Sequence, residues 1–211
     1  STAPQPCVCD LEIENDGSSI TGASISEGVN ILEGTAYESP MKPFGGVEQL
    51  AWNPNNEEIA YTCRKKTGID YAISTNSDIY LYDIRTRTHK NITEENKGYD
   101  TNPSYSPDGS QIAWLSMERD GYESDENRLM VLNLETGVQT FLTKGLDTNV
   151  DAFYWQDSQT IIFNAVWHGT EQLYKLTLDA QPIWRTITEG QYDHEPIDSD
   201  EEGFYFLRHS M

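Results

Sequence analysis

Apolar and polar residues alternate in short runs along this chain from about residue 50 to its end. Residues 78–84, Asp-Ile-Tyr-Leu-Tyr-Asp-Ile, are one such run, and alternation of this kind is typical of a β-strand with one buried face. The runs are shorter than most helices and are bounded by Pro, Gly, Asn and Asp. The pattern therefore predicts an all-β protein built from many short strands.

A hairpin recurs along the chain and defines a repeat. In its clearest copy, Pro103–Trp114, Ser106-Pro107-Asp108-Gly109 places proline second and glycine fourth, as a type I turn prefers. The copies lie about 43 to 53 residues apart, a period typical of propeller blades or solenoid units. The other copies are Leu50–Tyr61, Phe153–Phe163 and, more weakly, Pro196–Phe206.

Each of the first three hairpins is followed by a second pair of predicted strands. The last strand of each repeat ends in an aliphatic residue and a threonine, Ile92-Thr93, Leu142-Thr143 and Ile187-Thr188. Four strands in a repeat of this length are typical of a β-propeller blade. The second pairs are 78–84 with 88–93, 128–134 with 138–143, and 172–178 with 183–188, the last joined by a turn at Asp179–Gln181.

The two ends of the chain predict incomplete blades. Cys7–Ile13 and Val29–Leu32 are read as the third and fourth strands of an earlier blade, joined by a Gly- and Ser-rich linker at 14–28. We therefore predict an all-β, partial β-propeller with about three complete four-stranded blades plus two half blades. The two halves could close a four-bladed ring, but an excerpt of a ring of about seven or eight blades is the preferred interpretation.

The predicted division of the chain follows from these repeats. Residues 1–46 form a partial blade of outer strands and a linker, residues 47–195 form three propeller blades, and residues 196–211 form the first strands of a further blade. An open arc of this kind exposes strand edges, which favours pairing with another chain. A homodimer or a self-closed arc is therefore expected.

One face of the predicted propeller collects the chemically distinctive residues. Loops that join the second strand to the third, and one blade to the next, open on the same face, and here they are long and charged. We predict a mixed-charge rim that binds peptides or docks another domain, with a solvated rim as the plainer alternative. Its candidate residues are Arg64, Lys65, Lys66, Glu118, Arg119, His168, His194 and Arg208.

The loops between blades also repeat. Aligning Lys97–Asn102, Gly145–Asn149 and Gly190–His194 makes Asp100, Asp147 and Asp193 equivalent. An aspartate at this point can accept backbone N–H groups where the innermost strand begins, so a structural role is the first expectation.

The net charge excludes some classes of function, whereas the cysteine content does not identify the cell compartment. The chain has 35 acidic and 14 basic residues, a net charge of −21, which argues against nucleic-acid binding and favours a solvated surface or a channel that attracts peptide amines. No apolar run approaches the ~18 residues of a membrane span, and no signal peptide opens the sequence. Three cysteines without metal-site spacing do not distinguish periplasm from cytoplasm, so both remain open for a bacterial protein.

The familiar catalytic motifs do not occur in this sequence. It has no Gly-x-Ser-x-Gly, no phosphate-binding or dinucleotide-binding glycine pattern and no calcium-loop spacing. We therefore predict no catalytic residue, no metal site and no cofactor within the chain.

Several stretches resemble a known family. The hairpin Asn102–Trp114 is similar to the repeats of TolB-type propellers and of the prolyl-oligopeptidase family. Tyr37–Gly46, Ser74–Asp83 and Ser116–Tyr122 resemble the propeller of bacterial dipeptidyl-peptidase and acylaminoacyl-peptidase-like enzymes. The resemblance covers most of residues 30–211.

This resemblance implies a non-catalytic part of a serine peptidase. The parent protein would join the propeller to an α/β-hydrolase domain with a Ser-Asp-His triad, and would release dipeptides or acylated residues from the N-termini of oligopeptides. The propeller would admit short peptides and dock the hydrolase domain. A TolB-like propeller that acts only through protein–protein contacts is the alternative.

Overall fold

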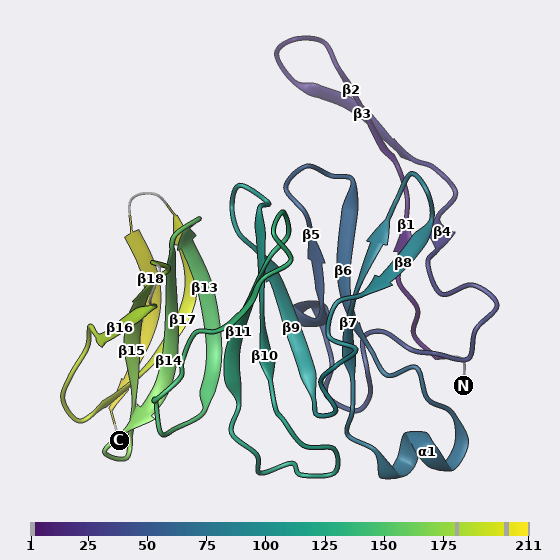
Figure 1. The fold of residues 1–211 in the computed structure, drawn as a ribbon. Coiled ribbons are helices and arrows are strands. Elements are labelled where there is room, and N and C mark those ends of the chain that lie inside the picture. Colours follow the sequence, from purple (N-terminus) through teal and green to yellow (C-terminus); the bar gives the residue numbers. More distant parts are fainter. Residues whose placement is uncertain (1–2, 180–181, 201–202, 211) are drawn as a thin grey trace.

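Three four-stranded antiparallel sheets follow one another along the chain and stand side by side (Figure 1). They are seen in a computed structural model that describes residues 3–179, 182–200 and 203–210. In each sheet the strands pair in sequence order, which confirms the all-β propeller architecture and the strand pairing that the repeat predicted.

The sheets have the following strands. The first sheet contains β5 (Leu50–Trp52), β6 (Glu58–Cys63), β7 (Asp78–Asp83) and β8 (Thr88–Asn91). The second contains β9 (Asp100–Tyr105), β10 (Gln111–Ser116), β11 (Arg128–Asn133) and β12 (Gln139–Phe141). The third contains β13 (Val150–Asp157), β14 (Thr160–Trp167), β15 (Thr170–Thr177) and β16 (Ile183–Thr186). The turn predicted at Asp179–Gln181 includes residues outside the described part.

The turn between β9 and β10 has the predicted form. The Gly109 N–H donates to the Ser106 carbonyl at 2.8 Å, and Gly109 has φ of 71°, a left-handed conformation that favours glycine. The Asp108 carboxylate accepts the Ser110 N–H at 3.0 Å, which closes the turn. The Ser-Pro-Asp-Gly sequence therefore fixes the register of the hairpin.

The second sheet has two buried faces because successive side chains of β10 point in opposite directions. Ile112 and Trp114 pack against the first sheet, whereas Ala113 and Leu115 pack against the third sheet. All four side chains are buried. Burying each large apolar side chain stabilises the fold by roughly 1.5–3 kcal/mol, so these two layers hold the sheets together.

The threonine that ends each repeat has the same role in all three sheets. Its hydroxyl accepts a backbone N–H from the third strand, at 3.0 Å for Thr93 with Ile79, 3.1 Å for Thr143 with Leu129 and 2.8 Å for Thr188 with Leu173. The hydroxyl satisfies a donor near the start of each third strand, at the residue before its pairing with the fourth strand begins. The repeated Ile-Thr or Leu-Thr ending is thus a structural feature of the sheet.

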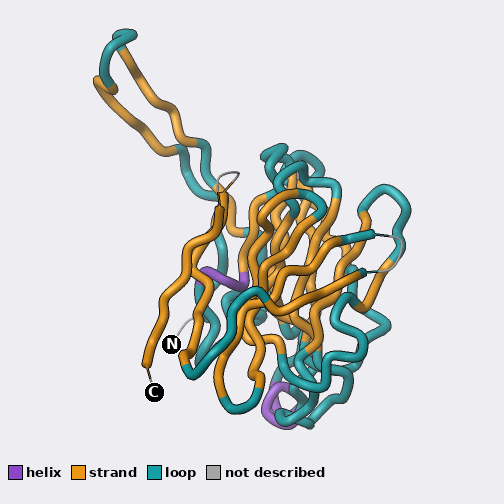
Figure 2. The backbone as a smooth tube through the Cα atoms, turned by 90° about the vertical axis from the view of Figure 1, so that its left-hand side faces the viewer, coloured by secondary structure: helices purple, strands orange, loops and turns teal. Residues whose placement is uncertain are grey.

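The N-terminal region differs from its prediction. β1 (Cys7–Val8) pairs with β4 (Val29–Asn30), but the intervening residues form a hairpin of β2 (Leu11–Asn15) and β3 (Ile20–Ile25) that projects away from the sheets (Figures 1 and 2). The expected single strand Cys7–Ile13 is therefore two strands, and most of the expected linker 14–28 is a hairpin.

The other end of the chain is a two-stranded sheet of β17 (Tyr192–Asp200) and β18 (Gly203–Ser210), with β17 beside the third sheet. Two short helices, η1 (Val47–Gln49) and α1 (Gly68–Ile73), complete the described elements. Neither helix is long and apolar enough to cross a membrane. The domain boundaries at 46 and 195 and the number of blades in the ring stay predictions.

Candidate functional site

The long connections of the first two sheets lie together at one end of the molecule (Figure 1). The β6–β7 connection contains α1, and it contacts the β10–β11 connection, residues 117–127. The third sheet differs, because β14 and β15 are joined by a two-residue turn, His168-Gly169, with φ of 52° and 86°. The expectation of a long loop at this point in every blade is therefore wrong for the third sheet. We call this end of the molecule the loop face.

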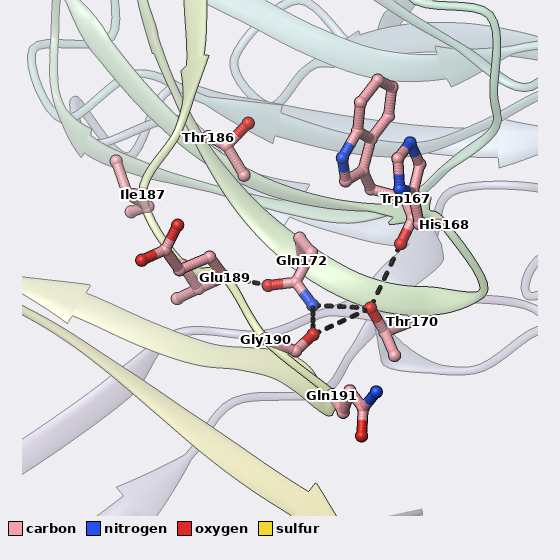
Figure 3. A pocket seen from close by; sticks show the side chains of 10 residues that line it. Trp167, His168, Thr170, Gln172, Thr186, Ile187, Glu189, Gly190 and Gln191 are labelled. Carbon is pink, nitrogen blue, oxygen red and sulfur yellow. Dashed lines mark hydrogen bonds between the residues drawn. The ribbon is translucent and has the colours of Figure 1, made fainter.

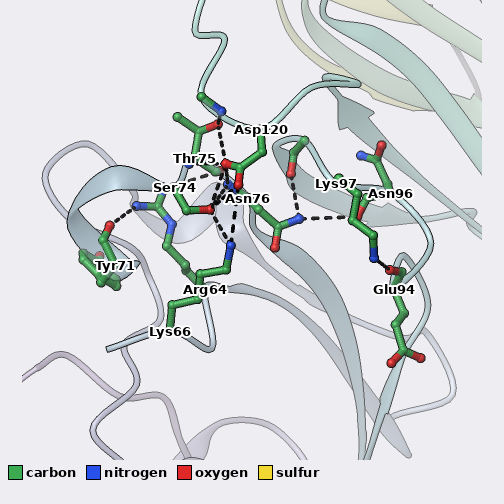
Figure 4. Close-up of polar contacts among 12 residues, drawn as sticks. Arg64, Lys66, Tyr71, Ser74, Thr75, Asn76, Glu94, Asn96, Lys97 and Asp120 are labelled. Atoms are coloured by element: carbon green, nitrogen blue, oxygen red, sulfur yellow. Dashed lines mark hydrogen bonds and ion pairs between the residues drawn. The ribbon is translucent and has the colours of Figure 1, made fainter. Parts of the chain in front are cut away.

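Asp120 joins the two long loops (Figure 4). Its Oδ1 accepts the Ser74 hydroxyl at 2.8 Å and the backbone N–H groups of Thr75 at 2.8 Å and Asn76 at 3.1 Å. In return, the Gly121 N–H donates to the Thr75 hydroxyl at 2.8 Å. These bonds lower the pKa of Asp120 despite its partial burial. We call these residues the Asp120 network, and it fixes the position of one loop relative to the other.

Two asparagines extend the network to the connection between the first two sheets. The Asn76 side-chain amide donates to the carbonyls of Asn96 and Gly98 at 3.3 and 3.2 Å. The Asn96 amide donates to the Met117 carbonyl at 2.9 Å and to Asp100 Oδ2 at 2.9 Å. Three loops are therefore held by one chain of hydrogen bonds (Figure 4).

Asp100 lies beneath this network at the start of β9. It is completely buried, and its Oδ1 accepts the Trp114 indole N–H at 3.0 Å. Burial raises the pKa of Asp100 to about 6, although its hydrogen bonds from Asn96, Ser116 and Trp114 act in the opposite direction. Asp100 is thus a buried carboxylic acid that anchors the loops to the sheet.

The predicted alignment of three aspartates is wrong. Asp193 Oδ1 accepts the Glu171 N–H at 2.9 Å, as Asn149 Oδ1 accepts the Asn127 N–H at 2.8 Å, so Asp193 is equivalent to Asn149. Asp147 is exposed. Val150 follows Asn149, and His194 follows Asp193. Both are buried in an innermost strand, as Asp100 is, so Asp100 corresponds to Val150 and His194.

The basic run Arg64-Lys65-Lys66 turns toward its own loop. The Arg64 guanidinium donates to the Tyr71 carbonyl at 3.2 Å and lies 4.9 Å from the centre of the Tyr71 ring. The Lys65 ammonium lies 3.7 Å from the centre of the Tyr80 ring, and burial lowers its pKa. Lys66 donates to the Ser74 hydroxyl and lies 3.8 Å from Asp120 Oδ2. These contacts order the loop that carries α1.

Glu118 and Arg119 lie on the neighbouring loop. Arg119 forms an ion pair with Asp125 at 2.6 Å, and its guanidinium lies 4.2 Å from the centre of the exposed Tyr122 ring. Glu118 pairs with Arg128 at 3.3 Å. Asp125 is mostly buried, but the Arg119 side chain is 58% exposed, so Arg119 can still contact a ligand from this position.

His168, His194 and Arg208 are distributed over the far side of the loop face. His168 is exposed and stacks on Trp167 with ring centres 4.5 Å apart. His194 is buried, and its Nδ1 lies 3.3 Å from the Glu171 carbonyl oxygen. Arg208 is opposite His194 in the β17–β18 pair and lies over the Tyr192 ring. The structure does not bring these residues together with Arg64, and their role in a rim stays a prediction.

A cavity of about 670 Å³ adjoins the Trp167–His168 stack (Figure 3). Its floor is the buried Gln172, whose amide donates to the Thr170 hydroxyl at 2.8 Å and to the Tyr192 carbonyl at 3.0 Å. The Thr188 hydroxyl donates to Gln172 Oε1 at 2.9 Å. Because the polar groups of Gln172 are already paired within the protein, this cavity offers few of them to a ligand.

A second cavity, of about 490 Å³, opens between the long loops, and we call it the loop-face cavity. Residues 41–45 form one wall, the loop that carries Arg64 and α1 forms another, and Met117 to Glu123 form the third. The sequence indicated Arg64 at this site but not the apolar lining, part of which lies on α1. This helix gives little signal in the sequence, because it is only six residues long and no side chain caps its start. The described residues hold no cluster of three or more His, Cys, Asp or Glu suited to a metal ion.

Curated relatives of this chain include dipeptidyl peptidases. It is 47% identical over 193 residues to dipeptidyl-peptidase 5 of Porphyromonas gingivalis, a match that covers 90% of this chain and 28% of the relative. It is 28% identical over 146 residues to dipeptidyl-peptidase 5 of Schizosaccharomyces pombe, covering 69% of this chain and 21% of the relative. The chain therefore spans less than a third of the length of these relatives.

Solved structures and a family model agree on the fold. TolB from Acinetobacter baumannii superposes with a TM-score of 0.53 and 21% identity, covering 77% of this chain and 37% of that chain. A puromycin-hydrolyzing peptidase from Mycobacterium tuberculosis superposes with a TM-score of 0.53 and 14% identity, covering 70% and 24%. The model of the TolB beta propeller domain matches residues 49–210. Because that match covers most of the chain, the chain belongs to the TolB β-propeller domain family.

Proposed function

We propose that this chain is the non-catalytic propeller portion of a serine exopeptidase that releases dipeptides or acylated residues from the N-termini of oligopeptides. The observation that carries the proposal is the 47% identity to dipeptidyl-peptidase 5 across 90% of this chain, which accounts for 28% of that relative. The remaining length of such a parent protein leaves room for an α/β-hydrolase domain in the same polypeptide.

The loop face is the part of the propeller that we assign to substrate entry and domain docking. Its long loops are ordered by the Asp120 network, while Arg119 and Tyr122 remain exposed at its edge. Binding groups carried by ordered loops on a rigid scaffold lose little entropy when a ligand arrives. A basic side chain here fits the carbonyl groups or the C-terminal carboxylate of a short peptide.

The test uses the complete parent protein and compares a peptide substrate with a small ester. Arg119→Ala should raise KM for oligopeptides several-fold and leave hydrolysis of the ester nearly unchanged, because the ester does not reach the loop face. The matched control is Arg85→Ala, an exposed arginine in the turn between β7 and β8. Equal losses on both substrates would contradict a role in substrate entry.

A binding propeller without catalysis is the second candidate, and the superposition on TolB favours it. The test is whether the parent protein releases dipeptides from oligopeptides and is labelled by a serine-directed phosphonate. If it does neither, the binding propeller becomes the better supported function.

The assembly and the compartment belong to the same proposal. We infer that the isolated chain forms a homodimer or a self-closed arc, because an open arc of blades exposes strand edges that favour pairing with another chain. Light scattering of the purified chain tests the homodimer, and a monomer at all concentrations would contradict it and favour the self-closed arc. The cell compartment is open between bacterial periplasm and cytoplasm, and fractionation of the host cells distinguishes them.

A further inference from the structure

We propose that the loop-face cavity binds an apolar side chain of an oligopeptide. This inference rests on the proposed function and names the substrate feature that the loop face recognises. The cavity volume of about 490 Å³ lies within the range of about 300–1,000 Å³ that is usual for ligand sites. A concave site of this size holds a large apolar side chain together with part of the adjoining peptide backbone, whereas a docked domain covers a broader surface of roughly 800 Å² on each partner.

The lining of the cavity has the chemistry that an apolar side chain needs. Met41, Phe44, Ala72, Ile73 and Met117 all line it. Phe44 is 94% exposed and Ile73 is 70% exposed, so two large apolar side chains border the cavity without a covering partner in this structure. Methionines adapt their shape to different apolar groups, which suits a site that admits several apolar residues.

The walls of the cavity are held in place before any ligand arrives. The Gln49 side chain is buried, and its Oε1 accepts the Met41 N–H at 2.7 Å. The Gly45 N–H donates to the Met41 carbonyl at 2.7 Å, which closes the 41–45 turn. The Asp120 network fixes the other two walls relative to each other. A preformed cavity loses little free energy to ordering on binding, so its apolar lining contributes directly to affinity.

The charged groups around the cavity are few and of mixed sign. Lys42, Arg64 and Glu123 line it, whereas the whole chain carries a net charge of −21. The cavity is therefore less acidic than the rest of the protein, and it offers a hydrogen-bond donor and an acceptor to the peptide backbone beside the apolar side chain. An acidic side chain would gain little from this lining, because burying a carboxylate against Met and Ile is unfavourable.

The experiment measures peptide affinity by fluorescence anisotropy on the complete parent protein. The probes are three labelled pentapeptides with Leu, Gly or Asp at the central position and an N-methylated second peptide bond that resists cleavage. The wild-type protein should bind the Leu peptide at least about tenfold more tightly than the Gly or Asp peptide, the usual effect of burying one large apolar side chain. Equal affinity for all three peptides would overturn the proposal.

Variants locate the effect. Phe44→Ala combined with Ile73→Ala should lower affinity for the Leu peptide about tenfold and leave affinity for the Gly peptide unchanged. Ile69→Ala is the matched control, because Ile69 is 76% exposed on the same helix α1 and is not part of the cavity lining. An equal loss in the control, or a loss of hydrolase-domain docking with peptide affinity intact, would overturn the assignment.

The failure of this inference differs from the failure of the proposed function. A parent protein that releases no dipeptide but still prefers the Leu peptide would contradict the peptidase proposal and support the cavity. A parent protein that releases dipeptides but binds the three probes equally would support the peptidase proposal and contradict the cavity.

Discussion

The two boundaries between neighbouring sheets use the same backbone position with opposite chemistry. Between the first and second sheets, β9 begins with Asp100, and between the second and third sheets, β13 begins with Val150. Both side chains are completely buried. The Asp100 N–H donates to the Ser77 carbonyl at 3.1 Å, and the Val150 N–H donates to the Asn127 carbonyl at 2.9 Å. The backbone fixes this position, whereas its side chain differs with the local surroundings.

The difference between Asp100 and Val150 follows from the residues that contact each side chain. Asp100 is bonded to Trp114 and to Asn96, and Asn96 also bonds the loop that leads to Asp120. Val150 instead packs in an apolar cluster with Leu146 and Leu115. The buried carboxylate therefore occurs where long loops must be ordered, and the apolar residue occurs next to the sheet whose corresponding connection is a two-residue turn. A buried polar group of this kind favours one loop arrangement over others.

Placing a carboxylate at the apolar boundary should have the largest effect. Val150→Asp buries a carboxylate without the indole and amide donors that Asp100 has, and we expect a loss of about 3–5 kcal/mol in the free energy of unfolding at neutral pH. Urea denaturation followed by tryptophan fluorescence measures it. Val138→Asp is the control, because Val138 is 59% exposed in the turn before β12 and should change stability by about 0.5 kcal/mol or less. A Val150→Asp protein within about 1 kcal/mol of wild type would show that this position accepts a carboxylate unaided.

Asp100 should make stability depend on pH in the weakly acidic range. Its pKa in the folded protein is about 6, above the ordinary value of 3.8, so the folded state keeps a proton that the unfolded state has lost. The contribution of Asp100 is therefore most favourable below about pH 4 and is lost as the pH rises through about 6. Asp100→Asn removes this loss, by about 3 kcal/mol if each pKa unit counts about 1.4 kcal/mol.

The measurement is the difference in unfolding free energy between wild type and Asp100→Asn across this range. The difference should change steadily between about pH 4 and 6 and level off above about 7. Asp83→Asn is the control, because hydrogen bonds from Thr86 lower the pKa of the half-buried Asp83, so its difference should stay flat above about pH 5. A flat difference for Asp100→Asn would mean that its environment does not favour the protonated form.

The sequence predicted the sheets well because their signals are local. Ser106 to Gly109 specify a turn within four residues. The bond of Thr143 to Leu129 spans only 14 residues, within one pair of neighbouring strands. The alignment of aspartates was wrong because it matched Asp100, Asp147 and Asp193 by the residue types around them. Backbone hydrogen bonding instead makes Asp100 equivalent to Val150. Residue type alone does not show which backbone group a residue is bonded to.

We did not predict the N-terminal hairpin or the loop-face cavity, for different reasons. The Asp16 carboxylate accepts the backbone N–H groups of Ser18 and Ser19, both at 2.9 Å, so a segment that looked like a flexible linker is a tight turn. The cavity depends on contacts between loops more than 40 residues apart, such as Ser74 with Asp120. The sequence indicated the charged residues of these loops but not the apolar wall between them.

The smallest predicted effect concerns the threonines, which have the same role at both boundaries. Thr143→Val keeps the shape of the side chain but leaves the buried Leu129 N–H without its acceptor, so we expect a loss of about 1 kcal/mol in unfolding free energy. Thr93→Val should cost the same within about 0.5 kcal/mol, because the bonded group is again a backbone N–H, that of Ile79. Thr140→Val on the half-buried strand β12 is the control and should change stability by less than either.

Urea denaturation of the three variants at pH 7 gives these values. A Thr93→Val loss that exceeds the Thr143→Val loss by more than about 1 kcal/mol would mean that the first boundary couples this threonine to its polar neighbours, among them the Asp78 carboxylate 3.5 Å from the Thr93 hydroxyl. Equal losses would mean that the threonine bond is a feature of every repeat and does not depend on the boundary. Asp100 and Val150, which begin the innermost strands, would then distinguish the boundary between the first and second sheets from the boundary between the second and third sheets.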